Sequence, residues 1–437
     1  MRSSKSRGIA ASAAVVLLLA ACSGGGGDDP TDNPTEDSSA PSGPIELTYW
    51  SWMADIELSV DAFNDSQDDI HVTLEAIPAG VAGGYAKFTN ALAASNAPDV
   101  MTIEYDHLAE YVSLGAVQAI EEFVEPSAFD AYPTSMVDLV TLDGIRWGLP
   151  YDAAPMLFYY RQDILDAAGI SVPRTWEEFE ASAAALQQAQ PGTYLGQYFP
   201  NEANVFAAFN WQAGAQWFGI EGDSWTVDID NPTSQEVAEY WQRLSDQGLV
   251  IRTQSWSEEW AQGIKNGTIA GVIGATWTAA NIAGNATGQD GLWRVAQLPS
   301  WDGVPATAAW SGSTFAITKD SEQAEAAAAF VTWMTQDPAG IEARTAGGRV
   351  VFPAYPPIVE TAKANYSNPV WGDQDLYAEF AIAYDSLVAG WMWGPAMNDT
   401  LTAIVDAGAA GTLTDALAAA QSATVDALKL RGLSVAE

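Results

Sequence analysis

Hydrophobic and polar residues alternate in two short segments early in the chain. Residues 45–50, Ile-Glu-Leu-Thr-Tyr-Trp, show this alternation, and residues 71–77 repeat it after a segment that predicts a helix through Phe63. Alternation over such lengths is typical of β-strands. A strand, a helix and a second strand predict a parallel sheet, since this connection is right-handed and returns the chain in the same direction. The pattern therefore predicts an α/β protein from residue 45 onward.

A different pattern, an uncharged run rich in aromatic residues, occupies residues 156–160. It follows Gly148-Leu149-Pro150 and Asp152, and it ends at Arg161. A continuous apolar run of this length predicts a strand that is buried on both faces. Further helices are predicted at the ranges 83–96, 162–168, 234–248 and 256–267.

Candidate binding residues stand where predicted strands end. A third strand at 98–103 leads to Glu104 and Asp106, and a strand at 269–274 leads to Trp277. In open α/β sheets ligands bind at the carboxyl ends of the strands, where Trp50 and Trp52 also fall. Of two tryptophans spaced in this way, we expect one to enter the core. Carboxylates at such a site could accept hydrogen bonds from neighbouring hydroxyl groups.

Length and composition set the broad class of the protein. A chain of 437 residues with 48% hydrophobic residues is long enough for two domains. Its net charge of -39 argues against nucleic acid or an anionic membrane surface as a partner. The two histidines and one cysteine argue against a metal site, and no cofactor is expected. The chain has no P-loop, so it is not expected to be an ATPase.

The N-terminal residues predict export. Arg2, Lys5 and Arg7 precede an apolar stretch at 9–21 that is short for a membrane span, as in a signal peptide at residues 1–21. Leu19-Ala20-Ala21-Cys22 resembles the lipobox of bacterial lipoproteins, which implies cleavage before Cys22 and lipidation of its thiol. An ordinary secretory signal with an incidental cysteine is the alternative. Residues 22–44 contain almost no large apolar side chain and predict a disordered tether.

The order of several motifs resembles the extracellular solute-binding proteins of sugar ABC importers, the maltose-binding-protein-like group. These motifs are the lipobox, Ala97-Pro98-Asp99-Val100, residues 148–161, Pro173 to Phe179, and the short strand before Trp277. The resemblance implies a type II-like fold of two α/β lobes, three interdomain crossings and a ligand cleft between the lobes. Lobe 1 would comprise 45–152 and 312–350, and lobe 2 would comprise 153–311 and 351–437.

This resemblance also implies a function and a set of site residues. The protein would be a monomer on the outer face of the cytoplasmic membrane, bind a sugar, close by a hinge and deliver the sugar to ABC permease subunits, without catalysis. At the crossing near residue 311 the family has two adjacent glycines, whereas this chain has Ser311-Gly312. Trp277 would stack on a sugar ring, unless it is a buried plug. The implied ligand-binding residues are Trp50, Trp52, Glu104, Asp106, Asp152, Trp211, Gln212, Trp277, Ser311, Gly312 and Trp393.

Two other classes of function stay open at this point. A secreted glycoside hydrolase needs two carboxyl groups facing each other across the scissile bond, and acidic residues are plentiful in this chain. A receptor for a polyamine or a cationic peptide would fit the acidic composition. The 18 tryptophans favour an oligosaccharide or glycoside over these alternatives, because indole rings offer an apolar face to a sugar.

Overall fold

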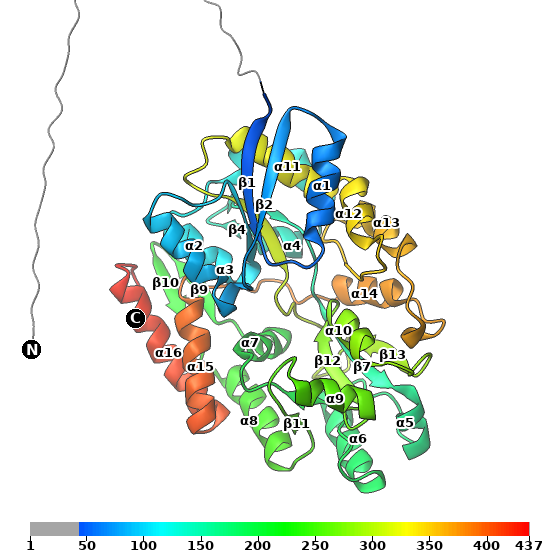
Figure 1. Cartoon of the computed structure of the whole chain (residues 1–437). Helices are drawn as coiled ribbons and strands as arrows, with labels where there is room; N and C mark the ends of the chain where they lie inside the picture. The colour runs from blue at the N-terminus through cyan, green and yellow to red at the C-terminus, as the bar shows by residue number, and fades with distance from the viewer. Residues whose placement is uncertain (1–42, 437) are drawn as a thin grey trace, which may run out of the picture. The chain divides into compact units, whose positions relative to one another are not determined.

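The computed structural model of the protein describes residues 43–436 (Figure 1). The expected signal peptide, Cys22 and the expected tether up to residue 42 lie outside the described residues. None of the helices between residues 43 and 436 is long and apolar enough to cross a membrane.

A five-stranded sheet contains the first predicted strands. Its order is β2-β1-β3-β14-β6, where β1 is Ile45–Ser51, β2 is Ile70–Ala76, β3 is Val100–Glu104, β14 is Ser313–Ile317 and β6 is Leu149–Pro150. Strand β1 pairs in parallel with β2 and β3, and helix α1 (Ile56–Ser66) connects β1 to β2. The predicted parallel β-α-β opening is therefore confirmed. Strand β14 runs antiparallel to β3 and β6.

A separate three-stranded sheet is built around the uncharged aromatic run. Its order is β12-β7-β13, and all pairs are antiparallel; β7 is Met156–Arg161, β12 is Gly271–Ala275 and β13 is Trp293–Gln297. Every residue of β7 is buried. The prediction of a strand buried on both faces is confirmed, because β7 is the central strand of its sheet.

The remaining elements cover these sheets and connect them. The other α-helices are α2 (Gly84–Ala93), α3 (Tyr105–Ser113), α4 (Thr134–Asp138), α5 (Gln162–Ala168), α6 (Trp176–Ala189), α7 (Ala203–Gln212), α8 (Pro232–Asp246), α9 (Glu258–Asn266), α10 (Thr278–Asn285), α11 (Ala324–Gln336), α12 (Pro338–Thr345), α13 (Val359–Ala364), α14 (Leu376–Asp385), α15 (Met397–Ala410) and α16 (Leu413–Leu430). Short two-stranded sheets are formed by β4 (Thr141–Leu142) with β5 (Ile145–Arg146), β8 (Gln197–Tyr198) with β11 (Ile251–Arg252), and β9 (Phe218–Glu221) with β10 (Ser224–Val227).

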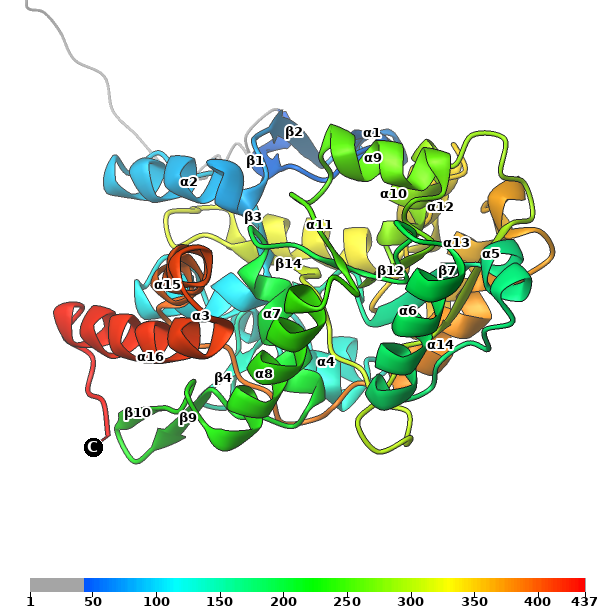
Figure 2. The same cartoon turned by 90° about the horizontal axis from the view of Figure 1, so that it is seen from below.

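The last two helices form a pair beside the rest of the chain. Helices α15 and α16 lie side by side, and the β9–β10 hairpin lies next to α16 (Figure 2). Helix α15 also packs against α3 and α7. Helix α15 therefore contacts both α3, which follows β3 in the sequence, and α7, which lies between β8 and β9.

Three segments run side by side between the two sheets. The backbone N–H of Ala153 donates to Phe352 O at 2.9 Å, and the N–H of Trp310 donates to Ala154 O at 3.0 Å. Tyr151 N likewise donates to Ser313 O at 2.9 Å. Segments near residues 152, 311 and 352 are thus held together by backbone hydrogen bonds. The assignment of particular residues to lobe 1 or lobe 2 stays a prediction.

Candidate functional site

A cleft of about 630 Å³ lies where these three segments meet the ends of β1, β3 and β12. The start of α7, Trp256 in the loop before α9 and the residues after β12 complete its walls. Six of the expected site residues line this cleft: Trp52, Glu104, Asp152, Trp277, Ser311 and Gly312. The structure thus brings together side chains that are up to 260 residues apart in the sequence.

One part of the cleft combines an indole with a carboxyl group. Trp52 packs edge-on against Tyr85, with ring centroids 5.6 Å apart. The Tyr85 hydroxyl donates to Glu104 Oε2 at 2.9 Å and accepts from the backbone N–H of Glu104 at 3.0 Å. These two bonds fix the direction of the Glu104 carboxyl group, which lies at the end of β3 as the sequence predicted.

A second part of the cleft repeats this combination with a cluster of indole rings. Trp256, Trp277 and Trp310 form a tryptophan wall in which the ring centroids are 5.0–5.8 Å apart. Beside it, Glu202 accepts a hydrogen bond from Ser255 Oγ at 2.6 Å. Trp256 has a φ of 55°, an uncommon and strained backbone conformation for a bulky residue.

The carboxyl groups of the cleft hold their protons more firmly than carboxyl groups in water. Burial, followed by the nearby Asp106, raises the pKa of Glu104 from 4.5 to about 7, although His107, Tyr85 and Ser311 oppose the rise. Burial also raises the pKa of Asp152 and of Glu202. Arg344 and Arg349 reach the cleft, but Arg344 already hydrogen-bonds Tyr151 and Arg349 pairs with Asp55. This environment suits a neutral polar ligand.

Asp106 does not face the cleft, in contrast to the sequence-based expectation. It lies in the first turn of α3, only 2% exposed, and its Oδ1 is 2.8 Å from His107 Nδ1. The Nε2 atom of His107 lies 3.1 Å from Asn398 Oδ1. Burial lowers the pKa of His107, but the nearby carboxyl groups, above all that of Asp106, outweigh this effect. The net result is a rise in the pKa from 6.5 to about 9. Glu104, Asp106 and His107 are close enough to hold a metal ion, yet both ring nitrogens already have hydrogen-bond partners.

The structure also places Trp50, Trp211 and Gln212 outside the cleft. Trp50 is 7% exposed in the core, with Lys87 Nζ 4.0 Å from its ring. Trp211 donates to Val388 O at 2.7 Å, and Gln212 contacts Trp176 and two backbone carbonyl groups. In α7 every residue except Asn204 is buried, so this helix has no polar face that could indicate which side meets the cleft.

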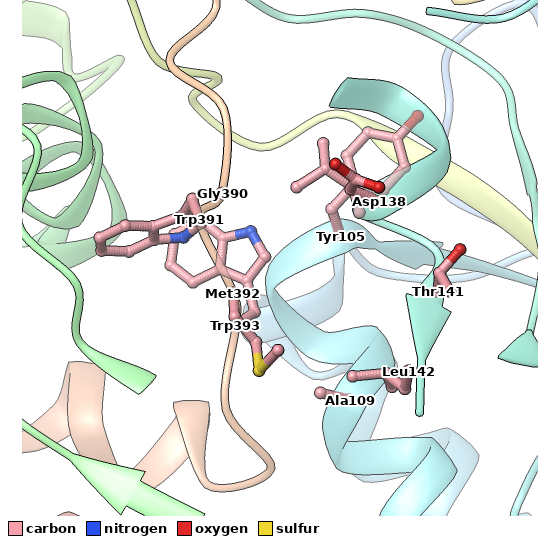
Figure 3. A pocket seen from close by; sticks show the side chains of 10 residues that line it. Tyr105, Ala109, Asp138, Thr141, Leu142, Gly390, Trp391, Met392 and Trp393 are labelled. Atoms are coloured by element: carbon pink, nitrogen blue, oxygen red, sulfur yellow. The ribbon is translucent and has the colours of Figure 1, made fainter. Parts of the chain in front are cut away.

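Trp393 lies in a different pocket of about 200 Å³ (Figure 3). Tyr105, Asp138, Trp391 and Met392 also line this pocket. Trp393 packs edge-on against Trp391, with ring centroids 5.1 Å apart, and it does not reach the larger cleft.

The cleft residues that the sequence analysis missed include Trp256, Trp310, Glu202 and Asn204. Trp310 directly precedes Ser311, which was an expected site residue, and this neighbouring position could have indicated that Trp310 lines the cleft. Trp256 was assigned to a predicted helix, but the structure begins α9 two residues later. Glu202 and Asn204 lie at the start of α7. This helix also contains Phe206, Phe209 and Trp211, and in the sequence these aromatic residues were the stronger indication of a binding surface.

The raised pKa of Glu104 predicts a dependence of stability on pH. The folded protein holds this proton more tightly than the unfolded chain, so the free energy of unfolding should decrease as the pH rises from about 4.5 to about 7. Glu104→Gln should remove this contribution and flatten the curve of melting temperature against pH in that interval. Scanning calorimetry of both proteins would measure it, and an equal slope in the two would contradict the prediction.

Comparisons with known proteins identify relatives of the whole fold. Residues 51–341 match the family described as bacterial extracellular solute-binding protein. The lactose-binding protein of Rhizobium radiobacter is 24% identical over 302 residues, which are 65% of this chain and 69% of that protein. The arabinooligosaccharide-binding protein of Halalkalibacterium halodurans is 24% identical over 309 residues, 67% of either chain.

Two solved structures are similar over nine-tenths of the chain. The galacto-N-biose-/lacto-N-biose I-binding protein of an ABC transporter from Bifidobacterium longum, in complex with lacto-N-biose, has a TM-score of 0.81 and 26% identity, covering 91% of this chain and 100% of its own. An ABC-transporter-associated binding protein from B. animalis subsp. lactis Bl-04, in complex with beta-1,6-galactobiose, has a TM-score of 0.77 and 26% identity, covering 90% of this chain and 100% of its own. The expected two-lobed α/β fold is therefore confirmed.

Proposed function

Since the chain belongs to the bacterial extracellular solute-binding proteins, we propose that it binds an oligosaccharide or glycoside and delivers it to an ABC permease. The observation that carries the proposal is the pairing of indole rings with carboxyl groups in one cleft. Trp52 accompanies Glu104, and the tryptophan wall accompanies Glu202. A pyranose ring has a face of C–H groups and a rim of hydroxyls, so it matches an aromatic face beside a hydrogen-bond acceptor.

A sugar fits the cleft better than the two alternatives do. A polyamine would be favoured by ionised carboxylates, whereas burial raises the pKa of Glu104, Asp152 and Glu202. A glycoside hydrolase would convert its ligand, whereas proteins of this family bind solutes. We therefore propose binding without catalysis, by a monomer that needs no metal ion or cofactor.

Release to the permease would depend on opening and closing of the cleft. We propose that lobe 1 (45–152 and 312–350) and lobe 2 (153–311 and 351–437) rotate about the three segments that run side by side between the sheets. Hinges of this kind need only a few residues that absorb the change in backbone angles. The tether and the lipid on Cys22 would keep the protein at the outer face of the cytoplasmic membrane.

A ligand screen tests the function directly. The melting temperature should be measured with lactose, lacto-N-biose, beta-1,6-galactobiose, maltodextrins and arabinooligosaccharides, and with spermidine as a cationic comparison. A ligand at 100 times its Kd adds about 2.7 kcal/mol to the free energy of unfolding. We expect at least one sugar to raise the melting temperature and to decrease the radius of gyration in X-ray scattering.

Other results of this screen would support one of the alternatives. A shift with spermidine alone, lost at high salt, would indicate a polyamine receptor. Release of product from a chromogenic glycoside would indicate a hydrolase.

The proposed anchor has its own test. Cys22→Ser should move the protein from the membrane fraction to the soluble fraction, because the lipid would have no thiol to join. Its melting temperature should equal that of the parent, since the substitution lies outside residues 43–436, which contain the two sheets and the cleft. If the variant remains in the membrane fraction, the lipoprotein proposal is wrong.

A further inference from the structure

Ser311 has a backbone conformation that normally belongs to glycine. Its φ is 60°, and the following Gly312 has a φ of 94°. For a residue with a Cβ atom, the left-handed region is strained, because the Cβ atom approaches the following carbonyl oxygen. Such a conformation persists when the surrounding structure fixes it. Because glycine would avoid the strain, a serine at this position indicates that its side chain has a role.

The surroundings of Ser311 do fix this turn. Gly312 O accepts from the backbone N–H of Tyr105 at 3.1 Å, and Ser313 N donates to Asp152 Oδ1 at 2.7 Å. A Cβ atom on Gly312 would lie 2.8 Å from the Tyr105 ring, so the neighbouring position has no room for a side chain. The two residues that follow Ser311 are therefore held in place, and the Ser311 side chain lines the cleft.

The Ser311 hydroxyl lies between two polar groups that come from different elements. Asn204, at the start of α7, donates from Nδ2 to Ser311 Oγ at 3.4 Å. Glu104, at the end of β3, lines the same cleft, and the Ser311 side chain opposes the rise in its pKa. All three side chains line the cleft. The result is a row of amide, hydroxyl and carboxyl groups, which we call the polar row.

We propose that Ser311 determines the specificity of the cleft, by placing the polar row so that it recognises two neighbouring hydroxyl groups of a sugar ring. The inference rests on the proposed function and adds which chemical group of the ligand is recognised, namely a pair of neighbouring hydroxyls. The amide donates, the carboxyl group accepts and the serine hydroxyl can do both, which matches the alternating needs of a vicinal diol. An analogue lacking one of these hydroxyls would leave a polar group of the row unpaired, and sites of this kind reject such analogues strongly.

Two substitutions separate the hydroxyl from the backbone conformation. Ser311→Ala removes the hydroxyl but keeps the Cβ atom, and Ser311→Gly removes both. Titration calorimetry with the sugar that binds the parent best should give an affinity loss of about tenfold or more in both variants. Ser311→Gly should melt at or above the temperature of the parent and above Ser311→Ala, because glycine adopts the left-handed region freely. Both variants should also lose the parent's discrimination against the corresponding deoxy sugar.

A matched control lies outside the cleft. Ser95 is exposed and has a φ of 49°, so Ser95→Gly makes the same change in a left-handed serine without touching the polar row. This variant should bind sugar like the parent. If both Ser311 variants also bind and discriminate like the parent, the inference is wrong. If the parent binds no sugar at all, the proposed function fails instead, and the two outcomes are distinguishable.

Discussion

Trp277→Ala should weaken sugar binding about thirtyfold, the largest loss of affinity that we expect from one substitution. Trp277 lies two residues after the end of β12, is half-buried and contributes to the tryptophan wall with Trp256 and Trp310. Loss of an aromatic anchor commonly costs on the order of 2 kcal/mol in binding, which corresponds to this factor. Titration calorimetry with the best sugar of the screen would measure it.

The same variant should change stability less than the loss of a core tryptophan. Trp277 keeps part of its surface exposed, and its indole N–H makes only a long hydrogen bond of 3.4 Å to Trp310 O. Trp293, fully buried in β13, is the matched control. Trp293→Ala should destabilise the fold by roughly 3–5 kcal/mol and leave the affinity of the remaining folded protein unchanged. A large drop in the melting temperature of Trp277→Ala with parental affinity would mean that Trp277 is a buried plug.

Gln212→Ala should destabilise the fold by about 3 kcal/mol or more, without weakening sugar binding. The side chain of Gln212 accepts from Trp176 Nε1 at 2.9 Å and donates to Pro299 O and Ala306 O at 2.7 and 2.8 Å. It is 4% exposed, so water does not replace these bonds when the amide is removed. Each buried polar group that loses its partner costs about 1–3 kcal/mol. Chemical denaturation would measure the change.

A glutamine on the surface provides the control for this experiment. Gln188 is exposed on α6, and Gln188→Ala should change the free energy of unfolding by about 0.5 kcal/mol or less. The opposite result for Gln212→Ala, a stable fold with weakened sugar binding, would restore Gln212 to the ligand site that the sequence suggested.

Strand patterns predicted the parts of the fold that position the cleft. Alternation at residues 45–50 and the uncharged run at 156–160 both became strands, because burial of one or both faces constrains which residues a strand can carry. The rule that ligands bind at strand ends also selected Trp52, Glu104 and Trp277, and all three line the cleft. These predictions succeeded since they depend on the backbone direction of single strands.

Predictions that depended on the rotation of a helix or the path of a loop were less successful. Trp211 and Gln212 belong to a helix that is buried on all sides, so its sequence contains no periodic difference between a core face and a cleft face. Trp256 looked like the first residue of a helix, whereas it adopts a left-handed conformation that positions its ring against Trp310. Such a conformation is set by tertiary contacts and has no signature in a single sequence.

The tryptophan wall gives the cleft an optical consequence. Its three indole rings have centroids 5.0–5.8 Å apart, a separation at which the electronic transitions of neighbouring rings couple. Coupled indoles produce circular dichroism in the near ultraviolet whose sign and intensity depend on the angles between the rings. A molecule that enters the cleft and turns one ring, even slightly, changes this spectrum. Occupancy of the cleft thus becomes visible without any attached dye, through chromophores that the chain itself supplies.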